Sequence, residues 1–154
     1  MKTHTATLAA GLTALALGTA NPGGSMGQAE PEQEVLDVIE AFNGAFAAND
    51  PDRYFTYIAE EITVLTPANP YRVEGIPDDR EEFEWGIRTG KSRVGYFQEM
   101  QPKVQLYGDV AVVTYFSRGS YGPEETVAYL KETDVLVRRE DGWRIVHIHV
   151  SATR

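Results

Sequence analysis

The fold is decided near the end of the chain, by the stretch Gly142-Trp143-Arg144-Ile145-Val146-His147-Ile148-His149-Val150-Ser151. Its β-branched residues follow the turn-forming pair Asp141-Gly142 and predict a strand that is entered from a hairpin. Because side chains alternate along a strand, one face should carry Trp143, Ile145, His147, His149 and Ser151, and the other Arg144, Val146, Ile148 and Val150. Both faces are partly apolar. We therefore expect helices to cover one face and a second subunit to cover the other.

Three more long strands should precede this one. Runs of β-branched and aromatic residues predict strands at about 94–107, 110–121 and 125–139, before the last strand at 143–152. The turns between them are short, so consecutive strands should be antiparallel neighbours. Pro102 interrupts the first of these strands, and proline cannot donate a hydrogen bond to the ladder. A bulge or sharp bend is therefore expected at Gln101-Pro102.

The preceding part of the chain is predicted to be mainly helical. Apolar residues recur on one face of a helix from about 31 to 48, and they are Val35, Ile39, Phe42 and Phe46. Asp50-Pro51 should begin a short helix, and Pro77-Asp78-Asp79 a third helix that ends near Gly90. Short strands are expected at 62–66 and 73–75, and the acidic run 78–82 is predicted to be solvated. The expected fold is α+β, a cone-shaped, strongly curved antiparallel sheet packed on three N-terminal helices.

Composition excludes several classes of function. With 154 residues the chain is long enough for one domain with a real core. Its formal charge of −9 repels phosphate backbones and anionic lipid, which argues against nucleic acid and membrane surfaces as partners. There is no cysteine, so disulfides and thiolate chemistry are excluded. No phosphate-binding glycine loop, nucleophilic serine motif or dinucleotide fingerprint is present, and we expect no cofactor.

The N-terminus has the pattern of an export signal. Lys2 supplies a weak positive charge, residues 6–17 an apolar run too short to span a bilayer, and the small residues around Ala20 a cleavage site. The alternative is a disordered alanine-rich leader. The predicted organisation is a signal peptide at 1–20, a flexible tether at 21–30 and a single domain at 31–154, which places the mature protein outside the cell or in the periplasm.

Several short pieces of the chain, in their order and spacing, resemble the nuclear transport factor 2-like superfamily. They are Asn49-Asp50 before Tyr54, 62–67, 73–75, Gly108-Asp109, Glu132-Thr133, Arg138-Arg139 and 143–151. The resemblance is nearest to the association domain of calcium/calmodulin-dependent kinase II and to SnoaL-like bacterial proteins. It implies a cone-shaped domain that is usually at least a dimer through its sheet, with a pocket between helices and sheet. The kinase pocket carries arginines that hold a carboxylate, whereas the matching positions here look like Ser117, Asp134 and Val150, so that anion site is lost.

Asp134 is the predicted candidate for chemistry. Its neighbours on the same strand face are Leu130, Glu132, Leu136 and Arg138. A carboxyl group walled by apolar residues is desolvated, which raises its pKa and makes it a usable general base near neutral pH. Phenolic donors nearby could stabilise an enolate. The predicted pocket consists of Tyr54, Tyr57, Trp85, Tyr115, Ser117, Glu132, Asp134 and Val150. The alternative is that Asp134 forms a structural ion pair with Arg88, Arg118 or Arg138.

His147 and His149 are the residues that suggest a metal. On a regular strand they point the same way with Cα atoms ~6.6 Å apart, close enough to ligate one ion. The only other histidine is His4, inside the leader, so a carboxylate would have to complete the site. The resemblance places the pair on the outer sheet face, so we expect His147 and His149, with Trp143, at a subunit interface rather than at a metal. Assembly would then be sensitive to pH between 5 and 7.

Three functional hypotheses follow from these patterns. The first is an exported, homo-oligomeric protein that binds a small, largely apolar molecule. The second is a SnoaL-like acid–base enzyme of the isomerase or cyclase type that uses Asp134. The third is a pure oligomerisation domain. Fold alone does not choose between them, because the superfamily that the chain resembles hosts isomerases, cyclases, dehydratases and plain binding modules.

Overall fold

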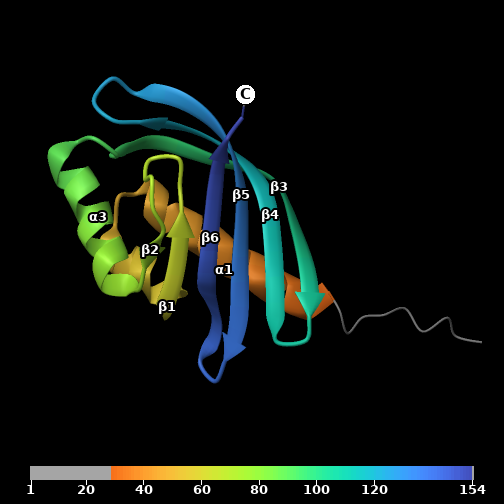
Figure 1. Cartoon of the computed structure of the whole chain (residues 1–154). Helices are drawn as coiled ribbons and strands as arrows, with labels where there is room; N and C mark the ends of the chain where they lie inside the picture. Colours follow the sequence, from red (N-terminus) through yellow and green to blue (C-terminus); the bar gives the residue numbers. More distant parts are fainter. Residues whose placement is uncertain (1–28, 154) are drawn as a thin grey trace, which may run out of the picture.

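The computed structural model describes residues 29–153 and has the predicted α+β architecture (Figure 1). The helical segments are α1 (Ala29–Ala47), α2 (Pro51–Tyr54) with the 3₁₀ turn η1 (Phe55–Tyr57), and α3 (Ile76–Thr89). The strands are β1 (Ile58–Leu65), β2 (Val73–Glu74), β3 (Val94–Tyr107), β4 (Val110–Tyr121), β5 (Thr126–Arg139) and β6 (Gly142–Ala152). The predicted signal peptide lies outside the described residues, as does the tether except for the two residues that begin α1.

One six-stranded sheet holds the fold together. Its strand order is β2-β1-β6-β5-β4-β3, and all neighbours are antiparallel except β1 and β6, which run parallel. In Figure 1, α1 crosses behind the long strands, and β3, β4 and β5 bend over toward α3. The sheet is therefore curved and unclosed, with one face toward the helices and one face outward.

The core lies between α1 and the inner face of the sheet. Val35 and Ile39 on α1 are fully buried, as are Ile62, Leu136 and Ile145 on β1, β5 and β6. The predicted stripe of α1 is thus the face that packs, and its burial is the main source of stability. Within residues 29–153, no helix is both long and apolar enough to cross a membrane.

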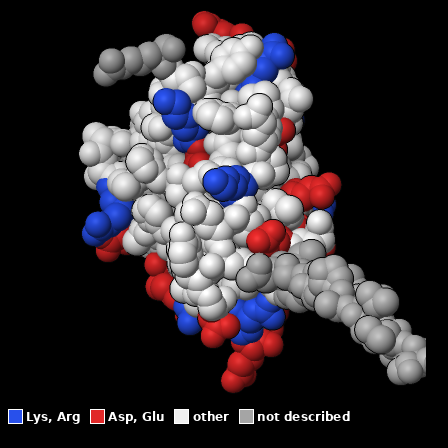
Figure 2. All heavy atoms as spheres, turned by 90° about the vertical axis from the view of Figure 1, so that its right-hand side faces the viewer, with Lys and Arg blue, Asp and Glu red and all other residues white. Residues whose placement is uncertain are grey.

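The break predicted in the first long strand is confirmed. The pairing of β3 with β4 shifts between Met100 and Lys103, and Gln101 has a φ of 55°. Such a bulge increases local twist, which bends a long strand. It also disrupts the free edge of the sheet, where a regular strand would invite pairing with another chain. Figure 2 shows this side of the molecule, mostly uncharged surface with a basic side chain near the centre and acidic side chains mainly in the lower half.

A second bulge, in β6, makes the predicted alternation wrong. Leu136 pairs with Ile145, but the preceding residue of β5, Val135, pairs with His147, so Val146 is an extra residue. Trp143 and Ile145 therefore face the core before the bulge, and Ile148 faces it afterwards. Trp143 is 3% exposed and belongs to the core, not to the face that carries the histidines.

Candidate functional site

A cavity of about 370 Å³ lies between the helices and the inner face of the sheet. Its volume is at the lower end of the range for small-molecule sites. Aromatic side chains supply much of its wall, and they are Phe42, Phe46, Tyr54, Phe83, Phe97 and Tyr121. The prediction of a hollow between helices and sheet agrees with this geometry.

The aromatic rings of the wall are packed against one another. The ring of Tyr54 stacks on that of Phe83 with centroids 4.6 Å apart, and Phe46 lies 5.9 Å from Phe83. Phe97 meets Phe46 edge-on at 5.4 Å. Such contacts hold rings in fixed positions. The wall joins α1, α2, α3 and β3 into one rigid apolar surface.

Asp79 is the buried acid that the sequence analysis missed. It lies in the first turn of α3, lines the cavity and is 8% exposed, so the prediction of a solvated acidic run is wrong at this position. Among the described residues its Oδ2 atom has no hydrogen-bond partner. Burial, and secondarily the charge of Glu82, raise the pKa of Asp79 to about 7.

Glu132 is an acidic residue of the predicted pocket, and it does line the cavity. It is 8% exposed on the inner face of β5, and the hydroxyl of Ser117 on β4 donates a hydrogen bond to its Oε1 atom. Burial raises the pKa of Glu132, while this hydrogen bond opposes the rise. Ser117 is itself fully buried behind the wall and does not line the cavity.

Asp134 lies deeper than predicted. Its side chain is fully buried and does not line the cavity. The Tyr115 hydroxyl donates a hydrogen bond of 2.9 Å to Asp134 Oδ2 and also lies 3.4 Å from Asn43 Oδ1. Burial, followed by the charge of Glu132, raises the pKa of Asp134 well above its usual value. Asp134 takes part in none of the ion pairs of residues 29–153, so the predicted pairing with an arginine is wrong, and Arg138 pairs with Glu34 instead.

The other predicted pocket residues divide into two groups. Tyr54 and Val150 line the cavity as expected. Tyr57 packs against the core without reaching the cavity, and Tyr115 is buried behind the wall. Trp85 is 42% exposed and does not line the cavity, and its ring lies 4.9 Å from the ammonium group of Lys91.

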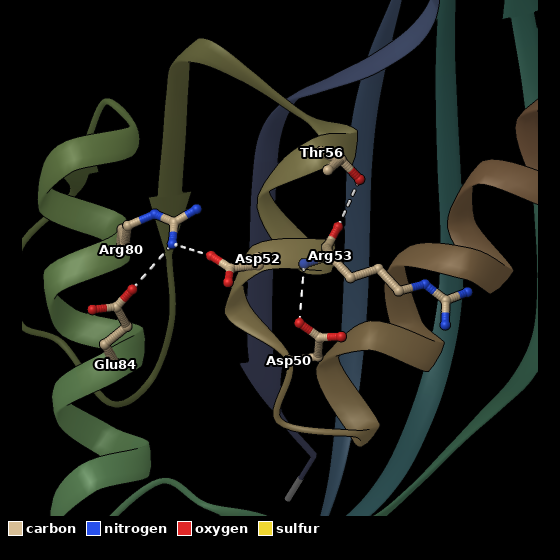
Figure 3. Close-up of polar contacts among 6 residues, drawn as sticks. All are labelled: Asp50, Asp52, Arg53, Thr56, Arg80 and Glu84. Carbon is tan, nitrogen blue, oxygen red and sulfur yellow. Dashed lines mark hydrogen bonds and ion pairs between the residues drawn. The ribbon is translucent and has the colours of Figure 1, made fainter.

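An ion-pair bridge fixes α3, and with it Asp79, against α2 (Figure 3). Arg80 Nη1 donates to Asp52 Oδ1 at 3.0 Å and to Glu84 Oε1 at 3.1 Å. Its guanidinium also lies 4.6 Å from the ring centroid of Phe55. The Asp50 side chain caps α2 by accepting a hydrogen bond from the backbone N–H of Arg53.

The histidine pair lies on the outer face of the sheet. His147 Nδ1 is 2.7 Å from the Thr63 hydroxyl oxygen on β1. Partial burial, followed by the charges of His149 and Arg72, lowers the pKa of His147. No group of three or more metal-ligating side chains occurs within the described part of the chain.

The comparisons with known proteins agree with this geometry. No curated protein matches the chain significantly. Among solved structures, an NTF2-like protein from Pseudomonas putida is 20% identical with a TM-score of 0.73, the match covering 82% of this chain and 89% of that one. The CaMKII hub of S. rosetta is 25% identical with a TM-score of 0.67, covering 79% and 95%.

A ketosteroid isomerase-like protein from Shewanella frigidimarina is 17% identical with a TM-score of 0.66, covering 79% of this chain and 97% of its own. This third likeness concerns the fold alone. The family profile of the calcium/calmodulin dependent protein kinase II association domain matches residues 31–154, which is the whole of the predicted domain. The chain therefore belongs to that association-domain family and has the nuclear transport factor 2-like fold.

Proposed function

We propose that this protein binds a small, largely apolar molecule in the cavity between its helices and its curved sheet. The observation that carries the proposal is the cavity itself, about 370 Å³ in volume, with a mostly aromatic and aliphatic lining and a few polar groups. Convergent polar groups in an apolar hollow are the usual composition of a ligand site. The export signal predicted at residues 1–20 would place this binding outside the cytoplasm.

Binding is better supported than acid–base catalysis by Asp134. A general base must come within hydrogen-bond reach of the proton that it removes. Asp134 is fully buried and lies behind the cavity wall, with one carboxylate oxygen engaged by Tyr115. A substrate in the cavity would not meet this carboxyl group directly.

A cavity-filling variant tests the proposal. Ala128 lines the cavity from β5, whereas its neighbour Val127 is 48% exposed and points the other way. We expect Ala128→Trp to weaken binding of the uncharged fluorescent probe N-phenyl-1-naphthylamine at least tenfold, and Val127→Trp to leave it unchanged. Native mass spectrometry of the purified protein would in addition reveal a copurified compound. Equal probe binding by both variants, or none by the wild type, would remove the proposal.

Self-association through the outer sheet face is the second proposed activity. Exposed aromatic side chains gather on this face around Arg118: Phe116 is 44%, Tyr129 51% and Tyr96 37% exposed, and the Arg118 guanidinium lies 5.5 Å from the Tyr129 ring and 5.6 Å from the Tyr96 ring. Contiguous exposed apolar surface is typical of a protein interface. The likeness to the S. rosetta CaMKII hub favours the same reading.

The oligomeric state tests this second activity. We expect light scattering after gel filtration to give a mass of at least two chains for the wild type. Phe116→Lys should lower that mass toward one chain, because it replaces an exposed aromatic ring by a charge directly opposite Lys131 on the neighbouring strand. Tyr71→Lys, a change at a 65% exposed residue between β1 and β2, is the control. A monomeric wild-type protein would contradict the proposal.

A further inference from the structure

We propose that the ligand of the cavity is an organic cation, an ammonium group carried on a small apolar body and held by Asp79 and Glu132 within the aromatic wall. The inference rests on the proposed function and specifies the chemical class of ligand. It reverses the chemistry that the family resemblance implied, in which arginines hold a carboxylate.

The first observation is the unsatisfied oxygen of Asp79. Its carboxyl group is more than nine-tenths buried, it lines the cavity, and Oδ2 accepts no hydrogen bond from any described residue. A buried polar atom without a partner costs stability, and most such atoms in native proteins are paired. This oxygen has almost no accessible surface, so a rotation of the carboxyl group would bring it to a donor on a ligand. Tyr121, which also lines the cavity, has a buried hydroxyl group that likewise finds no hydrogen-bond partner among the described residues.

The second observation is the imbalance of charge on the cavity wall. Three acids line the wall, Asp79, Glu82 and Glu132. The one basic residue of the lining, Lys91, extends its ammonium group toward the exposed ring of Trp85 and forms no ion pair in the described range. Glu82 is bonded only by the neutral amide of Asn69. The acids of the wall outnumber its one base, so above the pKa of Asp79 the wall carries net negative charge, which attracts a cation and repels an anion.

The third observation is the aromatic wall next to these acids. The rings of Tyr54, Phe83 and Phe46 are fixed by mutual contacts at 4.6 and 5.9 Å. The faces of aromatic rings attract cations, and ammonium ligands are commonly bound in aromatic cages. An ammonium ion on an apolar body would thus use the carboxylates for its charge and the rings for its substituents. A purely hydrocarbon ligand would leave the buried Oδ2 atom of Asp79 without a partner.

A permanently charged probe tests the inference without ambiguity about the ligand's own protonation. We expect isothermal calorimetry at pH 8 to detect benzyltrimethylammonium binding, and the same cation to displace N-phenyl-1-naphthylamine. Phenylacetate, its anionic counterpart, should displace none. Asp79→Asn should weaken binding of the cation at least tenfold more than it changes binding of the uncharged dye. Asp78→Asn, a change at the exposed preceding residue, should alter neither the affinity for the cation nor the affinity for the dye.

The response to pH supplies an independent readout. Other titratable groups that face Asp79 are Glu82 on α3, Tyr54 on α2, and Glu132 and Lys91 on the cavity wall. Because the probe keeps its charge, affinity should rise from pH 6 to pH 8 as Asp79 loses its proton, and Asp79→Asn should flatten this rise. Glu132→Gln, which also removes a wall charge, is the second variant should Asp79→Asn fail to fold.

The outcomes separate this inference from the proposed function. Dye binding by the wild type together with no binding of the cation would overturn the cation inference and leave the ligand cavity standing. The same holds if Asp79→Asn and Glu132→Gln both bind the cation as tightly as Asp78→Asn. Failure of the wild type to bind either probe would overturn both proposals.

Discussion

The hydroxyl group of Tyr115 on β4 donates a 2.9 Å hydrogen bond to Oδ2 of Asp134 on the neighbouring strand β5. Both side chains are buried, and the Oδ1 atom of Asp134 has no partner among the described residues. Burial is the first cause of the raised pKa of each group. The pair is therefore most stable when the carboxyl group of Asp134 is uncharged. The hydrogen bond between the two side chains is then a neutral polar contact inside the core.

Replacing Asp134 with asparagine should be tolerated. The amide oxygen can still accept the hydrogen bond from Tyr115, and no charge has to be buried. The pKa of Asp134 is higher in the folded chain than in the unfolded chain. The free energy of unfolding of the wild type is therefore highest below the unfolded-state pKa and declines as pH rises toward the folded-state pKa. We expect Asp134→Asn to be at least as stable as the wild type in urea at pH 8, with the difference shrinking toward pH 4.

The control for this change is Asp109→Asn, in the exposed turn between β3 and β4, which should show the wild-type dependence on pH. Affinity for N-phenyl-1-naphthylamine should stay within twofold in both variants, because Asp134 lies behind the cavity wall. Asp134→Asn with lower stability than the wild type at pH 8 would contradict the uncharged carboxyl group.

Asp79→Asn should remove a dependence of stability on pH. The pKa of Asp79 is about 7 in the fold, against a usual value of 3.8. Between these two values the unfolded chain has lost the proton and the folded chain keeps it, so stability falls as pH rises, by at most ~1.4 kcal/mol per pH unit. We expect Asp79→Asn to be more stable than the wild type above pH 7, by up to a few kcal/mol, in urea unfolding followed by circular dichroism.

Asp78→Asn is the matched control, because its side chain is exposed at the same end of α3. It should keep the wild-type slope of stability against pH. Parallel curves for Asp79→Asn and the wild type between pH 4 and 7 would show that Asp79 titrates normally.

The secondary structure was predictable because local signals and tertiary packing agree. The turns at Gly108 and Gly122 have positive φ values of 65° and 75°, which glycine adopts without strain, and they end strands where the sequence indicates. The bulge at Val146 was not predictable from alternation. Both faces of β6 carry apolar residues, so an extra residue leaves no visible break in the pattern.

The candidate site was predicted only in part. Glu132 follows from its place on the inner face of β5, two residues from Asp134. Asp79 was missed because it stands among four other charged residues at a helix start, although Phe83 one turn later on the same helix face lines the same cavity. Trp85 lies two residues after Phe83, a spacing that places it on another face of α3.

Arg80→Ala should loosen the contact between α2 and α3. Arg80 bridges Asp52 and Glu84 and covers the ring of Phe55, but its side chain is 34% exposed, and ion pairs at such sites contribute little. We expect a loss of about 1 kcal/mol in urea unfolding, mostly from the lost packing on Phe55. Arg88→Ala, at an exposed position of the same helix, should cost less than about 0.5 kcal/mol. Equal losses in the two variants would contradict a specific bridge.

Self-association should weaken as pH falls from 7.5 to 5.5. The pKa of His147 is lowered in the fold, first by burial and then by His149 and Arg72, so the folded chain takes up a proton less readily than the unfolded chain. Protonation would also place a charge on the outer face beside Thr63. Sedimentation velocity should therefore give a lower mass at pH 5.5 than at pH 7.5. In His147→Asn, whose amide can still bond to the Thr63 hydroxyl group, the change with pH should be smaller than in His149→Asn. A wild-type mass that stays constant over this range would exclude His147 as the sensor of pH.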